Sequence, residues 1–227
     1  MQTLALNRHS SNNSDDQTPN DSLFENIAQD IAHKGYSIQK HAVPKDLADI
    51  LHFHLTNMPG YKFNDASIGR QAGQQINENV RNDAIVWING LSPAGNKWLN
   101  WTQDLQVYLN RRLFLGLFSF ESHFAHYAKG NYYARHLDSF KGEANRVLSL
   151  VTYLNPDWQP QDGGELVIYR DAKDKVGTKV QPEFGTLAVF LSEEFEHEVL
   201  TTTCDRYSIA GWFRINTSKS NKSDPPL

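Results

Sequence analysis

The chain has 227 residues, of which 39% are hydrophobic, enough for one all-β domain with flanking helices or for two small domains. The formal net charge of −4 and the sequence pI of about 6.1 give no support for general binding to nucleic acid or to an anionic membrane surface. The single cysteine, Cys204, excludes a disulfide within the chain and fits a reducing compartment. No segment has the apolar run of a signal peptide or the roughly 20 apolar residues of a membrane span, so we expect a cytoplasmic protein.

The N-terminal part of the chain predicts a flexible segment followed by a helix. Residues 1–20 are mostly polar and lack apolar periodicity, so we expect them to be flexible. Ser22 and Glu25 have the spacing of a capping box, and apolar residues then recur at helical spacing. Gly35 is expected to end this helix, and residues 36–38 predict a short strand.

A second helix and a long polar loop come next. Pro44 is expected to open the helix, which carries His52 and His54; this pair is not favoured as a metal site, because residues two apart on a helix do not share a face. Residues 61–81 are polar and rich in Gly, Gln and Asn. A loop of this length predicts either a lid over a functional site or a passive surface hairpin, and residues 81–88 then predict a turn and a strand.

The rest of the chain predicts one long helix and then strands only. Residues 96–115 form an amphipathic pattern typical of a helix that packs on a sheet. The strands expected after it span residues 118–127, 132–136, 147–154, 165–169, 178–181, 186–190, 196–200 and 206–214. About eight short strands indicate a barrel or jelly roll. We therefore predict a mainly β fold with flanking helices: a single domain over 21–216, a jelly-roll core over about 117–214, and a flexible tail over 217–227.

The residues that carry chemistry lie within this strand-rich part. His136 and Asp138 are two apart, so on an extended strand both side chains point to the same face and can reach one metal ion. With His197 as a third ligand they form a set of two His and one carboxylate, which favours non-heme Fe(II) oxygenases. Arg206 follows His197 and offers a planar guanidinium suited to a carboxylate. Spacing alone leaves open that His136 and Asp138 form a surface pair and that Arg206 makes an ordinary ion pair.

Several longer stretches carry a family resemblance. The matching stretches are 81–88, 127–138, 146–155 with Trp158, 163–166, 197–199 and 206–209. Together they make the segment from about Tyr61 to Phe213 resemble the Fe(II)- and 2-oxoglutarate-dependent prolyl 4-hydroxylases, most of all the hypoxia-factor prolyl hydroxylases and their bacterial relatives. The resemblance implies a double-stranded β-helix, a jelly roll of two facing sheets with helices packed on one side.

The resemblance also implies a set of ligands. It implies that His136, Asp138 and His197 hold Fe(II). It further implies that Arg206 pairs with the distal carboxylate of 2-oxoglutarate and that Tyr153 donates a hydrogen bond to the same end. O2 is the second cosubstrate that it implies, with ascorbate in a supporting role. The carboxylate of Asp138 favours hydroxylation, since the relatives that halogenate lack it.

Three further residues are implied to line the cosubstrate pocket. Tyr127 would lie near the metal, and Leu166 and Val199 would supply apolar walls. Without the resemblance, the residues themselves favour core or cross-strand packing for both Tyr127 and Tyr153.

The implied substrate residues lie elsewhere in the chain. The resemblance places Arg146 close to the target segment of a protein substrate, with Trp212 as a wall of the pocket. It makes 63–82 the loop that closes over the substrate, with Arg81 and Asp83 as an ion pair at its base, although an ordinary surface salt bridge would also explain this pair. A loop of this length suits a proline-containing peptide better than free proline, and the bacterial relatives suggest a translation elongation factor.

The leading hypothesis is therefore a peptidyl-prolyl 4-hydroxylase, with oxygen sensing or translation-factor modification as its role. One alternative keeps the same iron chemistry but acts on another residue or on a small molecule. A second alternative is a non-catalytic metal-binding barrel that recognises a peptide. A zinc hydrolase is disfavoured, because Glu196 and Glu198 alternate with His197 and should point away from the metal.

Overall fold

The computed structural model describes residues 20–60, 63–65, 81–139 and 145–216. Most of the loop predicted over 61–81 and both ends predicted to be flexible lie outside the described residues. In the part of the chain that is described, no helix has the length and apolar character needed to cross a membrane.

Three α-helices form at the places that apolar periodicity predicts. They are α1 (Asp21–Lys34), α2 (Lys45–Thr56) and α3 (Pro93–Leu113). Gly35 ends α1 as expected: it adopts a φ of 79°, and its N–H donates to the carbonyl of Ile31. The Ser92 side chain caps the start of α3 by accepting from the N–H of Gly95.

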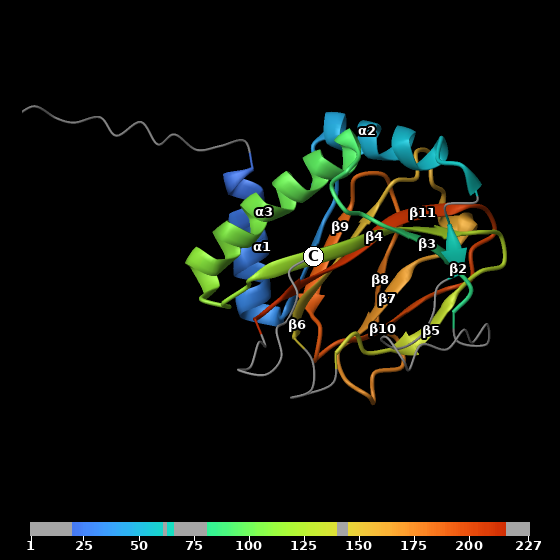
Figure 1. Ribbon diagram of the computed structural model, residues 1–227. Coiled ribbons are helices and arrows are strands. Elements are labelled where there is room, and N and C mark those ends of the chain that lie inside the picture. The colour runs from blue at the N-terminus through green and yellow to red at the C-terminus, as the bar shows by residue number, and fades with distance from the viewer. Residues whose placement is uncertain (1–19, 61–62, 66–80, 140–144, 217–227) are drawn as a thin grey trace, which may run out of the picture.

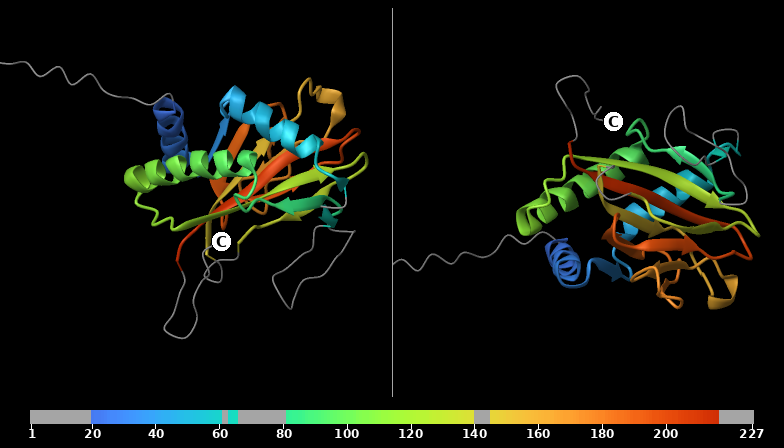
Figure 2. Two further views of the ribbon diagram at one scale, coloured as in Figure 1. Left: turned by 45° about the horizontal axis from the view of Figure 1, so that its top comes forward. Right: turned by 90° about the horizontal axis from the view of Figure 1, so that it is seen from below.

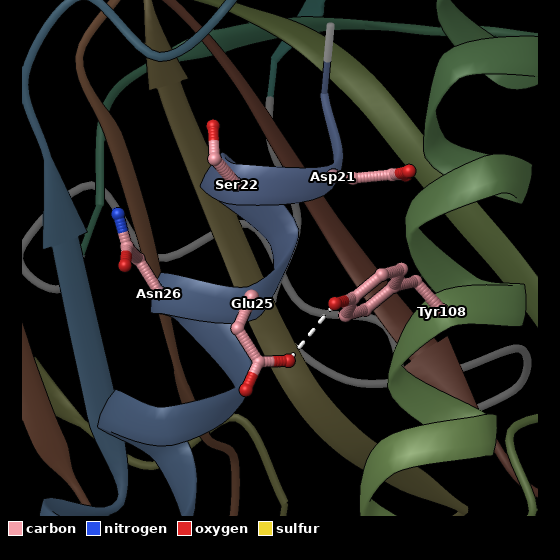
Figure 3. A pocket seen from close by; sticks show the side chains of 5 residues that line it. All are labelled: Asp21, Ser22, Glu25, Asn26 and Tyr108. Carbon is pink, nitrogen blue, oxygen red and sulfur yellow. Dashed lines mark hydrogen bonds between the residues drawn. The ribbon is translucent and has the colours of Figure 1, made fainter. Parts of the chain in front are cut away.

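The capping box predicted for Ser22 and Glu25 is wrong. Asn20 is the N-cap of α1, and its side chain makes no cap hydrogen bond. Glu25 instead accepts two hydrogen bonds from Arg112 and one from the Tyr108 hydroxyl, both on α3. A strong partner on the neighbouring helix therefore replaces the local contact that the spacing predicted. Glu25 and Tyr108 line a hollow of about 410 Å³ between α1 and α3, together with Asp21, Ser22 and Asn26 (Figure 3).

The strands form two antiparallel sheets, as expected for a jelly roll. The larger sheet has the order β1-β9-β6-β11-β4-β3-β2, and the smaller has the order β5-β10-β7-β8. The strands of the larger sheet are β1 (Tyr36–Gln39), β9 (Leu187–Leu191), β6 (Arg146–Tyr153), β11 (Arg206–Arg214), β4 (Ser119–Tyr127), β3 (Ala84–Trp87) and β2 (Asn64–Asp65). Those of the smaller sheet are β5 (Tyr133–His136), β10 (Glu196–Val199), β7 (Leu166–Tyr169) and β8 (Thr178–Val180), with a short 3-10 helix (Pro160–Asp162) before β7.

The two faces of the larger sheet have different partners. One face packs against the helices: Phe124, Ile209 and Phe213 belong to the same buried cluster as the apolar residues of α1, α2 and α3. The other face meets the smaller sheet, where Tyr127 and Tyr153 pack in a second buried cluster. Figures 1 and 2 show the three helices together on one side of the sheets, with β5, β10 and β7 away from them. The strand alternation therefore directs one set of side chains into the space between the sheets, where the candidate site lies.

Candidate metal centre

The two histidines and the aspartate predicted as ligands come together between the sheets. His136 ends β5, Asp138 follows it, and His197 lies directly opposite His136 on β10. The three potential ligand atoms lie within 4.8 Å of one another. The Nε2 atom of His136 is 3.7 Å from Asp138 Oδ1, and the Nε2 atom of His197 is 3.5 Å from Asp138 Oδ2. One ion could therefore bind all three side chains.

Backbone carbonyls orient both imidazoles. The Nδ1 atom of His136 lies 2.8 Å from the carbonyl oxygen of Ala134, and the Nδ1 atom of His197 lies 3.1 Å from that of Phe195. A carbonyl can only accept, so each Nδ1 carries the proton and each Nε2 keeps its lone pair toward Asp138. This is the arrangement in which neutral histidines bind metals.

The ionisation of the site also suits a cation. Burial acts to raise the pKa of Asp138, but His197, His136 and Arg146 outweigh burial and hold that pKa well below its usual range. Burial, with some help from His136, lowers the pKa of His197 to about 4. At neutral pH the group is therefore one carboxylate with a neutral His197, and metal binding needs no proton to leave either of them.

A serine on the facing sheet holds the carboxylate. Ser149 on β6 donates a hydrogen bond of 2.6 Å to Asp138 Oδ2, and the Ser192 hydroxyl lies 2.9 Å from the Ser149 hydroxyl. Since Ser149 occupies one side of Oδ2, it limits rotation of the carboxylate.

We predict that Ser149→Ala weakens binding of Mn(II) by roughly tenfold, because the carboxylate loses the group that orients it. Equilibrium titration of the purified variant, followed by the EPR signal of free Mn(II), measures the change. Thr152→Ser on the same strand is the control, because Thr152 bonds the carbonyl of Thr186 rather than a ligand. Equal Mn(II) affinity for Ser149→Ala and wild type would contradict this role.

His136, Tyr133 and Arg81 form a stack of three side chains, and Arg81 lies just before β3 in the chain. The ring of Tyr133 stacks on the imidazole of His136, with centroids 3.7 Å apart and planes inclined by 16°. The guanidinium of Arg81 lies 4.4 Å from the centre of the Tyr133 ring, and Arg81 also pairs with the buried Asp83 at 2.6 Å. The ion pair predicted between Arg81 and Asp83 is thus present. The Tyr133 ring separates its guanidinium from His136, a candidate metal ligand.

Arg206 lies deep between the sheets and is only 1% exposed. Its Nε donates to the carbonyl of Gly164 at 2.8 Å, and its Nη1 donates to the Ser208 hydroxyl at 3.1 Å. Its Nη2 has no hydrogen-bond partner among the described residues, and none of their carboxylates forms an ion pair with Arg206. A buried cation with a free donor is costly unless an anion completes it.

Two tyrosines line the same space as Arg206. The guanidinium carbon is 4.8 Å from the ring centre of Tyr127 and 5.1 Å from that of Tyr153. The Tyr153 hydroxyl is buried and makes no hydrogen bond of normal geometry within the described chain. Burial raises the pKa of Tyr153 to about 12 although Arg206 opposes it, and burial also raises the pKa of Tyr127, so both phenols keep their protons at neutral pH.

Apolar residues and a glycine complete this space. Leu166 and Val199 are opposite one another on β7 and β10 and belong to the buried cluster that contains Tyr127 and Tyr153. Gly164 has a φ of 64°, and a Cβ atom there would lie 3.0 Å from Arg206 Cδ and 3.2 Å from Thr202 Cβ. A side chain at this position would therefore be strained and would crowd Arg206.

Aromatic side chains lie beside Ser149 on the face of the large sheet from which Ser149 reaches Asp138. Trp212 pairs with Ser149 across β11 and β6, and the guanidinium of Arg146 lies 3.6 Å from a Trp212 ring centre. Arg146 also donates to Glu121 at 2.7 Å, so its charge is already neutralised. Trp87 is half-exposed, and the ring of the buried His123 lies 5.2 Å from that of Trp87 and 5.4 Å from that of Trp212.

We predict that His123 makes folding pH-dependent. Burial, Arg81 and Arg146 lower its pKa from 6.5 to about 3, against the opposing effect of Asp83 and Asp138. As the pH falls, His123 of the unfolded chain therefore binds a proton near pH 6.5, whereas His123 of the folded chain binds one only near pH 3. The free energy of unfolding of the metal-free protein should therefore fall as the pH drops through this window, by up to about 1.4 kcal/mol per pH unit from this group.

Urea unfolding at several pH values, in wild type and in His123→Phe, measures this dependence. The slope of the unfolding free energy against pH should be smaller in the variant, by up to about 1.4 kcal/mol per pH unit, which corresponds to one proton. Equal slopes in the two proteins would show that His123 does not carry the effect.

The comparison with known proteins agrees with this geometry. Residues 122–214 match the 2OG-Fe(II) oxygenase superfamily. A crystal structure of a Pseudomonas putida prolyl-4-hydroxylase is 38% identical to the chain, covers 85% of it and 99% of its own length, and superposes with a TM-score of 0.76. The chain belongs to the Fe(II)- and 2-oxoglutarate-dependent prolyl 4-hydroxylase family. This confirms the predicted family and the double-stranded β-helix fold.

Two animal proteins are also similar to the chain. A Trichoplax adhaerens prolyl hydroxylase, solved with a hypoxia inducible factor oxygen degradation domain peptide fragment, is 25% identical, covers 86% of this chain and 90% of its own, and has a TM-score of 0.74. Human Egl nine homolog 1 is 28% identical over 162 residues, which are 67% of this chain and 37% of the human protein. The chain thus spans less than half the length of the curated relatives that it matches.

Members of this family use Fe(II), 2-oxoglutarate and O2, and the described residues fit the first two. Two imidazole nitrogens and one ionised carboxylate are a donor set for Fe(II) that leaves coordination positions open. The free Nη2 of Arg206 and the free hydroxyl of Tyr153 are buried donors without acceptors, which is what the distal carboxylate of 2-oxoglutarate requires.

Some residues of the site were not predicted from the sequence. Ser149 and Ser192 hold Asp138, Tyr133 stacks on His136, and His123 lies between two tryptophans. Ser149 had a signal that could have found it: it is a polar residue two and four positions before Val151 and Tyr153, on the same side of a mainly apolar strand. His52 and His54, which the sequence did not favour as a metal site, belong to no potential metal site among the described residues; His52 contacts the carbonyl of Leu154 and His54 the ring of Phe124.

Proposed function

We propose that this protein hydroxylates a prolyl residue in a protein or peptide substrate, with Fe(II), 2-oxoglutarate and O2. One observation carries the proposal. A potential three-ligand metal site and a buried arginine without a carboxylate partner lie between the same two sheets, lined by the same cluster of residues. A module that only binds a peptide around a metal has no need of the second feature.

We propose that His136, Asp138 and His197 hold the metal. Arg206 and Tyr153 would bind the distal carboxylate of 2-oxoglutarate, as the two free donors support. Tyr127, Leu166 and Val199 would line the remainder of the cosubstrate pocket; their place in one buried cluster supports this assignment.

The cofactors would carry out the oxidation, and the residues of the chain would bind and orient them. When bound, Fe(II) and 2-oxoglutarate would activate O2, which is the oxidant: one oxygen atom of O2 would enter a substrate C–H bond as hydroxyl, and the other would enter succinate as carbon dioxide leaves. Ser149 and the carbonyls of Ala134 and Phe195 keep the ligands oriented. Arg206 neutralises and positions the cosubstrate, and the apolar walls exclude water.

The aromatic residues near Ser149 support an apolar target such as a prolyl ring. Arg146 is paired with Glu121 and stacked on Trp212, so we assign it to positioning Trp212 rather than to binding an acidic side chain. The half-exposed ring of Trp87 presents aromatic surface and packs on the buried ring of Trp212, and the His123 ring that contacts both is neutral because burial lowers its pKa to about 3. Arg81 and Asp83 would anchor the base of the segment before β3, most of which lies outside the described residues.

The identity of the protein substrate belongs to the same proposal. The similarity to the Pseudomonas putida enzyme supports a bacterial-type member, and the similarity to the Trichoplax adhaerens enzyme supports a peptide substrate. We propose a translation elongation factor as the target to test first, which would place the reaction in the cytoplasm.

The experiment measures succinate formed from 2-oxoglutarate under air with Fe(II), with and without proline-containing peptides. A peptide from an elongation factor should stimulate succinate formation and gain the mass of one oxygen atom. The same peptide with its proline replaced by alanine should do neither. Stimulation by the alanine peptide would favour the same chemistry on another residue. No turnover and no 2-oxoglutarate binding would leave the non-catalytic peptide-binding barrel.

A further inference from the structure

The outer face of the small sheet carries a compact polar cluster, which we call the outer clamp: Arg135, Glu196, Tyr169, Glu198 and the loop from Asp171 to Gly177. Arg135 directly precedes His136 on β5, and Glu196 directly precedes His197 on β10. Side chains alternate along a strand, so the clamp points away from the metal site while its neighbours point into it. The strands β5, β10 and β7 lie side by side in this order (Figure 1).

Every nitrogen of the Arg135 guanidinium has a partner. Its Nε and Nη2 lie 2.7 Å and 2.6 Å from the same carboxylate oxygen of Glu196. Its Nη1 donates to the carbonyl of Asp174 and its Nη2 to the carbonyl of Asp171, each at 2.9 Å. Its guanidinium carbon also lies 3.7 Å from the ring centre of Tyr169 on β7. One side chain of β5 is thereby tied to β10, to β7 and to the loop that follows β7.

The loop that receives Arg135 is held rigidly by its own side chains. Asp171 accepts from the N–H groups of residues 173 and 174. Asp174 accepts from the N–H groups of residues 170, 176 and 177, and these bonds, that of Gly177 most of all, lower the pKa of Asp174 to about 2. The two carbonyls that bind Arg135 therefore belong to an ordered turn rather than to a loose loop.

The direct pairing between β5 and β10 is slight. It consists of His136 opposite His197 and Tyr133 opposite Val199, with a register irregularity between them. Within the described strands β5 is an edge strand of the small sheet. The distance between the two imidazoles therefore depends on a short and irregular strand pairing. Between β5 and β10 the structure records one ion pair of oppositely charged side chains, which is Arg135 with Glu196.

We propose that Arg135 is a positioning residue, which holds β5 against β10 from the outer face and so keeps His136 and His197 at the separation that one metal ion needs. The inference rests on the metal site of the proposed function. Arg135 touches neither the metal ligands' imidazoles nor the cosubstrate pocket. Its effect passes through the backbone of β5 and Glu196.

An ordinary exposed ion pair would have no such role. Such pairs contribute roughly 0–1 kcal/mol to stability and are not expected to change a ligand site. The chain contains a matched example: Arg112 on α3 binds Glu25 through Nε and Nη2 at 2.7 Å and 2.6 Å, and Tyr108 donates to the same carboxylate. This pair joins two helices on the side of the large sheet opposite the metal site. Arg112→Met therefore measures the effect of losing a comparable ion pair that does not involve β5.

The test is the affinity for Mn(II), a redox-stable probe, measured by EPR on wild type, Arg135→Met, Arg135→Lys and Arg112→Met. We expect Arg135→Met to bind Mn(II) roughly tenfold more weakly, the lower range for groups that orient ligands. Arg135→Lys keeps a charge for Glu196 but cannot bond both loop carbonyls, so it should recover part of the affinity. Arg112→Met should bind like wild type. The EPR line shape of bound Mn(II) should also change in Arg135→Met alone.

Thermal unfolding of each metal-free variant separates positioning from stability. A folded Arg135→Met that binds Mn(II) with wild-type affinity overturns the inference, even if its melting temperature is lower. If Arg135→Met does not fold, Glu196→Gln takes its place, because it removes the pair and leaves the bonds to the loop. Glu196→Gln should bind Mn(II) several-fold more weakly, and wild-type affinity in this variant overturns the inference as well.

Failure of the proposed function gives a different result. If wild type itself does not bind Mn(II), the metal site is wrong, and the comparison among variants has no signal. If wild type binds Mn(II) and all variants bind equally, the metal site stands and only the role of Arg135 is lost.

Discussion

His136→Ala is expected to abolish succinate formation and to weaken Mn(II) binding by at least roughly 100-fold. That figure is the upper end of the loss seen when a group beside a ligand is removed, and His136 is itself a ligand candidate. Only two of the three potential ligands, Asp138 and His197, would remain. The ring of Tyr133, which stacks on His136, would also lose its support. Mn(II) titration by EPR and a succinate assay measure the two effects separately.

His126→Ala is the matched control for this loss. His126 pairs with an aspartate, Asp205, at 3.1 Å and stacks on Tyr207, yet within the described ranges no third potential ligand joins them. Its replacement should leave Mn(II) affinity and succinate formation close to wild type. A His136→Ala variant that still binds Mn(II) like His126→Ala would remove the basis of the proposed function.

Arg206→Met is expected to weaken 2-oxoglutarate binding by about 30- to 5000-fold while Mn(II) binding stays near the wild-type value. Loss of one partner from a buried charge pair costs roughly 2–5 kcal/mol, and the factor is that energy expressed as an affinity. Methionine fills much of the volume of arginine but offers no donor. Isothermal titration of 2-oxoglutarate into the Mn(II)-loaded protein measures the change.

Two further variants make this prediction sharper. Tyr153→Phe removes only the free hydroxyl, so 2-oxoglutarate should bind about 2- to 10-fold more weakly, as expected for one hydrogen bond. Arg112→Met removes an arginine from the helix side and should leave 2-oxoglutarate binding unchanged. If 2-oxoglutarate bound equally to Arg206→Met and wild type, the cosubstrate would have to bind elsewhere.

The strands and helices could be predicted because their signals are local. The last strand, expected over 206–214, forms over Arg206–Arg214, and the helix expected over 96–115 forms over Pro93–Leu113. The two-residue spacing of His136 and Asp138 likewise predicted that both side chains could reach one metal ion, and their potential ligand atoms do lie close together. The local signal failed at Ser22, where Glu25 had better partners, Tyr108 and Arg112, on a helix more than eighty positions away.

The contacts that complete the site could not be predicted, because they depend on which strands become neighbours. Ser149 reaches Asp138 only after β6 faces the end of β5 across the two sheets. Arg135 meets Glu196 only because β5 pairs with β10, and these residues are 61 positions apart in the chain. The pairing of Arg146 with Glu121 likewise joins β6 to β4, which are separated by β11.

The alternation along β11 has a consequence for how such a chain can diverge. Arg206, Ser208 and Trp212 face the small sheet, while Ile209 and Phe213 pack against the helices. Substitutions can alter one face and leave the other unchanged. Changes on the face toward the small sheet can therefore alter substrate preference, and changes on the face toward the helices can alter stability, independently of one another. Insertion or deletion of a single residue within β11 would invert the alternation on one side of the change, so that Arg206 and Trp212 could no longer both face the small sheet if the change fell between them. Length variation among descendants of this sequence should therefore be confined to the connections between strands.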